Sequence, residues 1–139
     1  MKVFLALSIF SLFLNPLIAQ PEIKMEDNSN KLAVLWTSGD PDVAEKMCFM
    51  YTYNAKKQGW FDEVVLIVWG PSAKLLAENE MLQNYVKRMK DAGIKIEACI
   101  ACAKMYGVDK KLTELGIEVK GMGTPLTAYL KKNWKVLSL

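Results

Sequence analysis

The sequence predicts an α/β sandwich built on a mostly parallel β-sheet. Two continuous apolar runs of strand length, Leu32 to Thr37 and Val64 to Trp69, lack the polar alternation of a strand with one solvated face. Such runs are typical of strands buried on both faces, as in a parallel sheet. Stretches of helical periodicity follow them after only a few residues, and this alternation favours parallel strands joined by helices.

Three further segments have the character of strands. Ile94 to Cys99 alternates more, so we expect this strand to lie nearer an edge of the sheet or to carry one solvated face. Ile117 to Val119 and Lys135 to Leu139 are shorter candidates.

Helix signals occupy the segments between these strands. Asp40 and Pro41 are typical of a helix start, and the helix they predict covers Val43 to Lys57. Its core-facing stripe is expected to consist of Val43, Met47, Met50, Tyr51 and Ala55. Cys48 lies on this helix, and we interpret it as a buried structural thiol. Further helices are predicted over residues 79–92, 100–106 and 109–115, and from Thr124 through Leu130.

The first residues have the pattern of an export signal. A short basic start is followed by the uncharged segment Val3 to Ile18, rich in Phe, Leu and Ile, and then by Ala19. We expect residues 1–19 to be a secretory signal peptide, residues 20–30 a flexible lead-in and residues 31–139 one domain. The mature protein is then exported, to a periplasm or out of the cell, and it contains no membrane span.

Composition excludes several classes of function. The sequence has no histidine, which removes Ser-His-Asp triads and histidine-ligated metal sites. Loss of Lys2 with the signal peptide leaves 17 basic against 15 acidic residues, a net charge of +2. Arg88 is the only arginine, whereas proteins that read nucleic acids rely on clustered arginines. We therefore expect no nucleic-acid partner and no cofactor.

Four loops are expected to converge where ligands gather in an open parallel sheet, beyond the carboxyl ends of the strands. They are residues 37–40, 69–72, 99–102 and 121–124. The second of them, Gly-Pro-Ser, is typical of a turn and helix cap, and without histidine Ser72 has no obvious base to activate it.

Cys99 and Cys102 are the predicted reactive residues. Cys99 ends a predicted strand and precedes a predicted helix, where unpaired N–H groups stabilise a thiolate. Cys102 follows three residues later on the same helix face, so the pair can close a short disulfide or pass sulfur between its members. The structural alternative is a disulfide kept by an oxidising compartment, or two core cysteines. A metal is not expected, because one Cys-x-x-Cys supplies too few ligands for zinc.

The run from Cys99 to Val108 (CIACAKMYGV), together with Val68 to Ser72 (VWGPS), resembles the DsrE/DsrF-like family. The likeness extends over Lys31 to Leu139 in segment order and length. The family includes sulfur-relay subunits of tRNA thiolation and of dissimilatory sulfur oxidation. The resemblance implies a three-layer α/β/α sandwich with a mostly parallel five-stranded sheet, commonly assembled into trimers or hexamers. It also implies that Cys99 matches the persulfide-carrying cysteine, while Cys102 falls where those members often have alanine.

Two hypotheses of function follow. In the first, an exported protein handles sulfur through Cys99 and Cys102, as a persulfide carrier, a sulfurtransferase or a thiol-redox protein. Its partners would be a sulfur donor or acceptor protein, or a small sulfur compound. In the second, the chain is a non-catalytic oligomeric module of the same fold that binds a small ligand or has a structural role. Under both hypotheses we expect the protein to assemble as a homotrimer or a homohexamer.

Overall fold

A computed structural model of the protein describes residues 30–139. The predicted signal peptide and residues 20–29 of the lead-in lie outside the described residues. The five strands form one sheet in the order β4-β3-β2-β1-β5, and every neighbouring pair is parallel. The strands are β1 (Lys31–Trp36), β2 (Glu63–Val68), β3 (Lys95–Cys99), β4 (Glu118–Lys120) and β5 (Lys135–Ser138). The predicted α/β/α fold class is confirmed, with a sheet that is parallel throughout.

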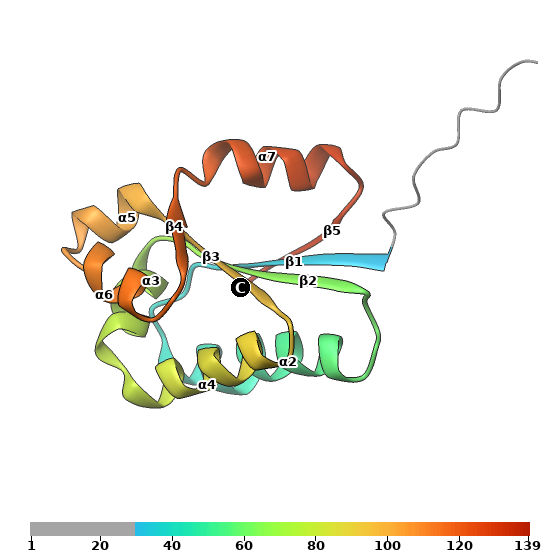
Figure 1. The fold of residues 1–139 in the computed structure, drawn as a ribbon, viewed down its shortest axis with the longest axis horizontal. Helices are drawn as coiled ribbons and strands as arrows, with labels where there is room; N and C mark the ends of the chain where they lie inside the picture. The colour runs from blue at the N-terminus through green and yellow to red at the C-terminus, as the bar shows by residue number, and fades with distance from the viewer. Residues whose placement is uncertain (1–29) are drawn as a thin grey trace, which may run out of the picture.

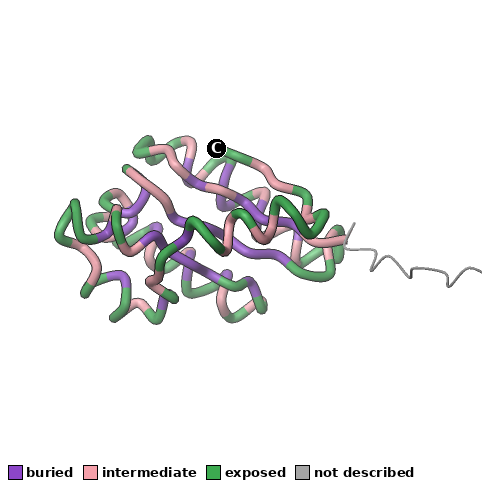
Figure 2. Tube along the Cα trace, turned by 90° about the horizontal axis from the view of Figure 1, so that it is seen from above, coloured by how far each residue is buried: buried purple, intermediate pink, exposed green. Residues whose placement is uncertain are grey.

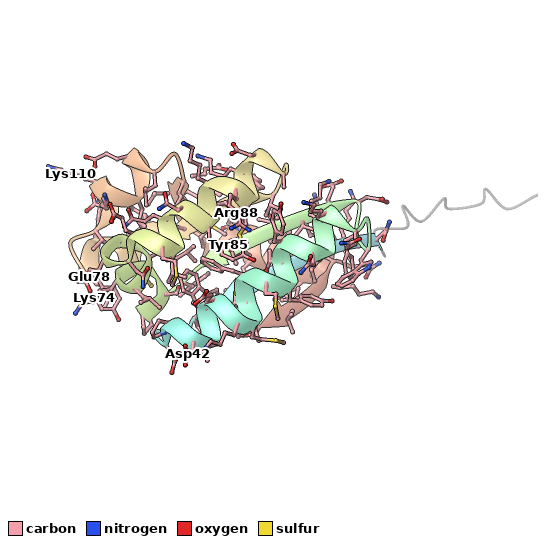
Figure 3. The ribbon with its side chains drawn as sticks, turned by 90° about the horizontal axis from the view of Figure 1, so that it is seen from below. Asp42, Lys74, Glu78, Tyr85, Arg88 and Lys110 are labelled. Atoms are coloured by element: carbon pink, nitrogen blue, oxygen red, sulfur yellow. The ribbon has the colours of Figure 1, made fainter. Side chains whose placement is uncertain are left out.

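Helices cover both faces of the sheet unequally (Figure 1). α7 lies over one face, and α2 and α4 lie over the other (Figure 1). On this second face the side chains of Tyr85 and Arg88 extend from α4 toward α2 (Figure 3). The helices are α1 (Pro41–Val43), η2 (Ala44–Phe49), α2 (Met50–Lys57), α3 (Pro71–Glu78), α4 (Glu80–Asp91), α5 (Ile100–Met105), α6 (Asp109–Glu114) and α7 (Gly123–Lys131). Among the described residues, no helix is both long enough and apolar enough to cross a membrane.

The sheet separates two apolar clusters, and buried residues run along the central strands (Figure 2). The larger cluster packs against α2, α3 and α4 and contains Trp36 and Phe49, whose rings meet edge to face at 4.8 Å. The smaller cluster lies on the α7 face and contains Ile67, Cys99 and Met122. In β2 every residue after Glu63 is buried, as its unbroken apolar run predicts.

The first long helix begins as predicted but presents a different face to the core. Asp40 caps it by accepting hydrogen bonds from the backbone N–H groups of Asp42 and Val43, at 2.8 and 3.1 Å. A π-helical segment, η2, then changes the angular spacing of the side chains. The predicted stripe is therefore wrong at Met47 and Met50, which are 44% and 50% exposed. The buried residues are instead Ala44, Cys48, Phe49, Thr52 and Ala55.

β3 lies next to the edge strand β4, as its alternating sequence predicts. The alternative expectation of a solvated face is wrong, since only Lys95 at the start of the strand is exposed. Glu97 is completely buried beneath α7, where positively charged neighbours compensate its charge. The sequence pattern cannot distinguish such a compensated carboxylate from a solvated one.

Candidate functional site

The loops at the carboxyl ends of the strands converge as predicted. Trp69 N–H donates to the Trp36 carbonyl at 3.0 Å, which joins the loops after β1 and β2. The loop after β2 in turn contacts the start of α5, because Gly70 N–H hydrogen-bonds the Cys102 sulfur. Met122 packs in the same apolar cluster as Cys99. The parallel sheet thus brings all four loops to the same end of the sheet, beyond the carboxyl ends of its strands.

Cys99 and Cys102 are brought together at this carboxyl end of the sheet. Cys99 is the last residue of β3 and the N-cap of α5, and the side chain of Cys102 is hydrogen-bonded to it. Burial raises the pKa of the Cys102 thiol, and the hydrogen bond with Cys99 raises it further. A hydrogen bond that raises the pKa of a thiol favours its protonated form.

Gly70 opposes this effect on Cys102. Its N–H group donates to the Cys102 sulfur and lowers the pKa of that thiol, against the larger effect of burial. Gly70 has φ +70° and ψ −137°, a conformation that residues with a Cβ rarely adopt. The glycine is thus required for the backbone N–H to be directed at the cysteine.

The position of Cys102, one helical turn after Cys99, predicts that it lies deeper in the site. The structure shows the opposite, because Cys99 is only 5% exposed and Cys102 is partly exposed. α5 has only six residues, so the axial dipole available to Cys99 is smaller than for a full-length helix. All three cysteines are free thiols in this structure. The pair is therefore a reduced, hydrogen-bonded dithiol whose more accessible member is Cys102.

Cys48 and Ser72 have the structural roles predicted for them. Cys48 is completely buried, and burial raises the pKa of its thiol to about 12, which keeps it protonated and unreactive. Ser72 is also buried, and its hydroxyl donates to the Trp36 carbonyl at 2.7 Å while accepting from Trp69 N–H at 3.0 Å. The Ser72 hydroxyl therefore ties two strand ends together.

Sequence reasoning missed a network of charged residues on the same face of the sheet as Cys99. Lys95, Glu97 and Cys99 alternate along β3, and in the β3–β4 register Cys99 lies opposite Lys120. Lys95 and Lys120 approach the same oxygen of Glu97 at 2.6 and 2.9 Å. Both lysines also contact Glu118, at 3.2 and 2.7 Å. These four charged side chains form a closed ring of ion pairs on β4 and on β3, the strand that ends in Cys99.

α7 completes this network. The Tyr129 hydroxyl donates to the second oxygen of Glu97 at 3.1 Å. Burial, together with the negative charge of Glu97, raises the pKa of Tyr129 to about 12. The hydrogen bond to Glu97 likewise raises the pKa of Lys95, and Lys120 lowers the pKa of Glu118. The sequence signal for this network was the i, i+2 spacing of Lys95, Glu97 and Cys99, which places them on one face.

The fold and the dithiol define a class of protein, namely parallel α/β sandwiches with a cysteine at the carboxyl end of a strand. A model of the DsrE/DsrF-like family matches residues 30–139. The chain belongs to the DsrE/DsrF-like family. No curated protein sequence matches it significantly.

Two solved structures have the same fold. One is a conserved protein of unknown function, BT1422 from Bacteroides thetaiotaomicron, with 43% identity and a TM-score of 0.76. The alignment covers 79% of this chain and 95% of that one. The other is the ychN protein from E. coli, with 13% identity and a TM-score of 0.63, covering 79% of this chain and 99% of that one. At that identity the likeness to ychN concerns the fold alone.

Proposed function

We propose that this protein handles sulfur through Cys99, with Cys102 as the second thiol of the reaction. The observation that carries the proposal is the position of Cys99, which is the last residue of β3 and the N-cap of α5, with Cys102 beside it on α5. At this position Cys99 lies where the loops converge beyond the carboxyl ends of the strands, and it acts as the nucleophile of the pair. Membership of a family linked to sulfur relay supports the same assignment.

The chemistry is a pair of exchanges at sulfur. Cys99 as thiolate attacks the outer sulfur of a donor persulfide, forming a Cys99 persulfide and releasing the donor thiolate. Cys102, after losing its proton to solvent, then attacks the inner sulfur, the Sγ of Cys99. The new Cys99–Cys102 bond oxidises the two cysteines by two electrons, and the outer sulfur leaves reduced, as hydrosulfide. An external thiol reduces the disulfide again. Alternatively, an acceptor thiolate takes the outer sulfur directly and no disulfide forms.

Access to Cys99 constrains the donor. At 5% exposure its sulfur is nearly closed to solvent, whereas Cys102 is partly exposed. A small sulfur compound meets this constraint more easily than a folded protein partner. The same burial, with the raised pKa of Cys102, favours the second candidate function, a non-catalytic oligomeric module in which both thiols are structural.

Mass spectrometry of the intact protein separates the two functions. After incubation with sodium tetrasulfide and removal of excess reagent, the wild type should gain the mass of one sulfur atom or, once Cys102 has released that sulfur, lose the mass of two hydrogens as the disulfide closes. Dithiothreitol should reverse both changes. Cys99→Ser should not load, Cys102→Ser should load but release hydrosulfide poorly, and Cys48→Ser should load as the wild type does. Equal loading of Cys99→Ser contradicts the assignment, and a wild type that gains no sulfur and forms no Cys99–Cys102 disulfide favours the binding module.

Assembly and export belong to the same proposal. We propose that three or six copies associate, as in other members of this family, and light scattering that gives a monomer at micromolar concentration contradicts this. The apolar segment Val3 to Ile18 supports export, which places the dithiol where oxidants are available.

A further inference from the structure

A second candidate site lies on the α7 face of the sheet, apart from the cysteine pair. It is a cavity of about 460 Å³ between the C-terminal half of α7 and the sheet. Neither Cys99 nor Cys102 lines it. Its volume falls within the range of small-molecule sites in proteins. Because α7 is the helix that covers this face (Figure 1), the cavity is bounded by one helix and the strands beneath it.

The floor of the cavity is polar but already satisfied. Glu97 lies there, completely buried, with Lys95 and Lys120 on one carboxylate oxygen and the Tyr129 hydroxyl on the other. A carboxylate with three such partners has little capacity to bind an incoming cation. The floor therefore fixes the shape of the cavity and does not attract a metal ion or an amine.

The wall is apolar and carries two aromatic rings. The rings of Tyr129 and Trp134 lie 4.6 Å apart at an angle of 55°, and Pro125 and Ala128 of α7 adjoin them. Tyr129 and Trp134 are each only partly buried. Aromatic and small apolar side chains of this kind pack against planar ligands.

Positive charge dominates the rim. Four lysines line the cavity, and the three carboxylates that pair with them are Glu63, Glu97 and Glu118. The four lysines therefore carry one positive charge more than the three carboxylates neutralise. Within residues 30–139 the ammonium group of Lys132 makes no hydrogen bond or ion pair, whereas Lys95 and Lys120 are each held by two carboxylates. The unbalanced charge is therefore assigned to Lys132, at the C-cap of α7.

We propose that this cavity binds a small organic anion, a carboxylate or sulfonate on a planar apolar body. The planar part packs against Trp134 and Tyr129, and Lys132 attracts the anionic group. Binding at this site does not require the cysteine chemistry, so it persists in Cys99→Ser.

The test is a titration of the ¹⁵N-labelled protein, in which the indole N–H resonance of Trp134 is followed by NMR. The probes are naphthalene-2-carboxylate and naphthalene-2-sulfonate, with the neutral naphthalene-2-methanol as the matched control. Both anions should shift the Trp134 resonance saturably. The neutral compound should bind about fivefold more weakly, since an exposed ion pair is worth up to about 1 kcal/mol. Binding of one anion and not the other identifies the preferred head group.

Lys131 provides a matched control variant. It neighbours Lys132 and is likewise exposed on α7, but it does not line this cavity. Lys132→Gln should weaken binding of the anions about fivefold, and Lys131→Gln should leave it unchanged. The proposal is overturned if neither anion moves the Trp134 resonance at millimolar concentration, if the neutral compound binds equally well, or if the two lysine variants behave alike.

Discussion

The Tyr129 hydroxyl lies 3.1 Å from the buried carboxylate of Glu97 and donates a hydrogen bond to it, which ties α7 to the middle of β3. Within residues 30–139 no other side-chain hydrogen bond joins α7 to the sheet, so this contact has a disproportionate effect on how the helix is held. The apolar cluster around Met122 provides the remainder of the attachment.

Replacing Tyr129 with Phe should lower the free energy of unfolding by about 1.5 kcal/mol at pH 7, because hydrogen bonds to charged groups contribute on that order. The pKa of Tyr129 is raised in the folded protein from 10.0 to about 12. Its contribution is therefore fully present below about pH 10 and is lost as the pH rises toward 12. Urea denaturation at pH 7, 10 and 11.5 should show the difference from Tyr129→Phe shrinking along the series. Tyr106→Phe is the control, because Tyr106 is exposed and its hydroxyl makes no side-chain hydrogen bond within residues 30–139. An unchanged difference at pH 11.5 would contradict this account.

Gly70→Ala should destabilise the protein by about 1–3 kcal/mol, since a residue with a Cβ is strained at this positive φ. It should also raise the pKa of Cys102 further, because a shifted loop withdraws the Gly70 N–H from the sulfur. Gly121→Ala is the matched control, as Gly121 has no positive φ and no atom near an added Cβ. Denaturation and thiol titration measure the two effects, and equal behaviour of the two alanine variants would refute the role assigned to Gly70.

Alkylation of Cys102 by iodoacetamide should be slower at pH 8 than that of free cysteine and should continue to accelerate above pH 9. The raised pKa of this thiol leaves little thiolate at neutral pH. Removing the hydrogen-bond partner in Cys99→Ala lowers that pKa and should speed labelling at pH 8. The rates are measured by peptide mass spectrometry. Faster labelling in the wild type than in Cys99→Ala would contradict the effect of Cys99 on the pKa of Cys102.

The apolar segment before Ala19 predicts cleavage near the Ala19–Gln20 bond when the full chain is expressed in a cell with a secretion system. Edman sequencing of the exported material should begin at Gln20 or within a few residues of it. Material that begins at Met1 and remains inside the cell would contradict the prediction.

Unbroken apolar runs identified β1 and β2, and Asp40 with Pro41 identified the start of the first long helix. These signals are local, and so was the Cys-x-x-Cys spacing that singled out Cys99 and Cys102. The π-helical segment was missed because one altered turn rotates Met47 and Met50 outward without changing composition.

The environment of Glu97 was missed for a different reason. Its two lysines and Tyr129 come from three separate elements, and only the fold brings them together. The order of exposure of the two cysteines likewise depends on how the Gly70 loop packs over α5, which the spacing of the cysteines does not reveal.

The sheet ends on both sides in very short strands, β4 with three residues and β5 with four. Charged side chains at Glu118, Lys120 and Lys135 occupy these borders. Short, charged borders discourage a second chain from adding its own strand by backbone pairing. However many copies associate, each should retain a separate sheet and meet its neighbours through side chains of helices and loops.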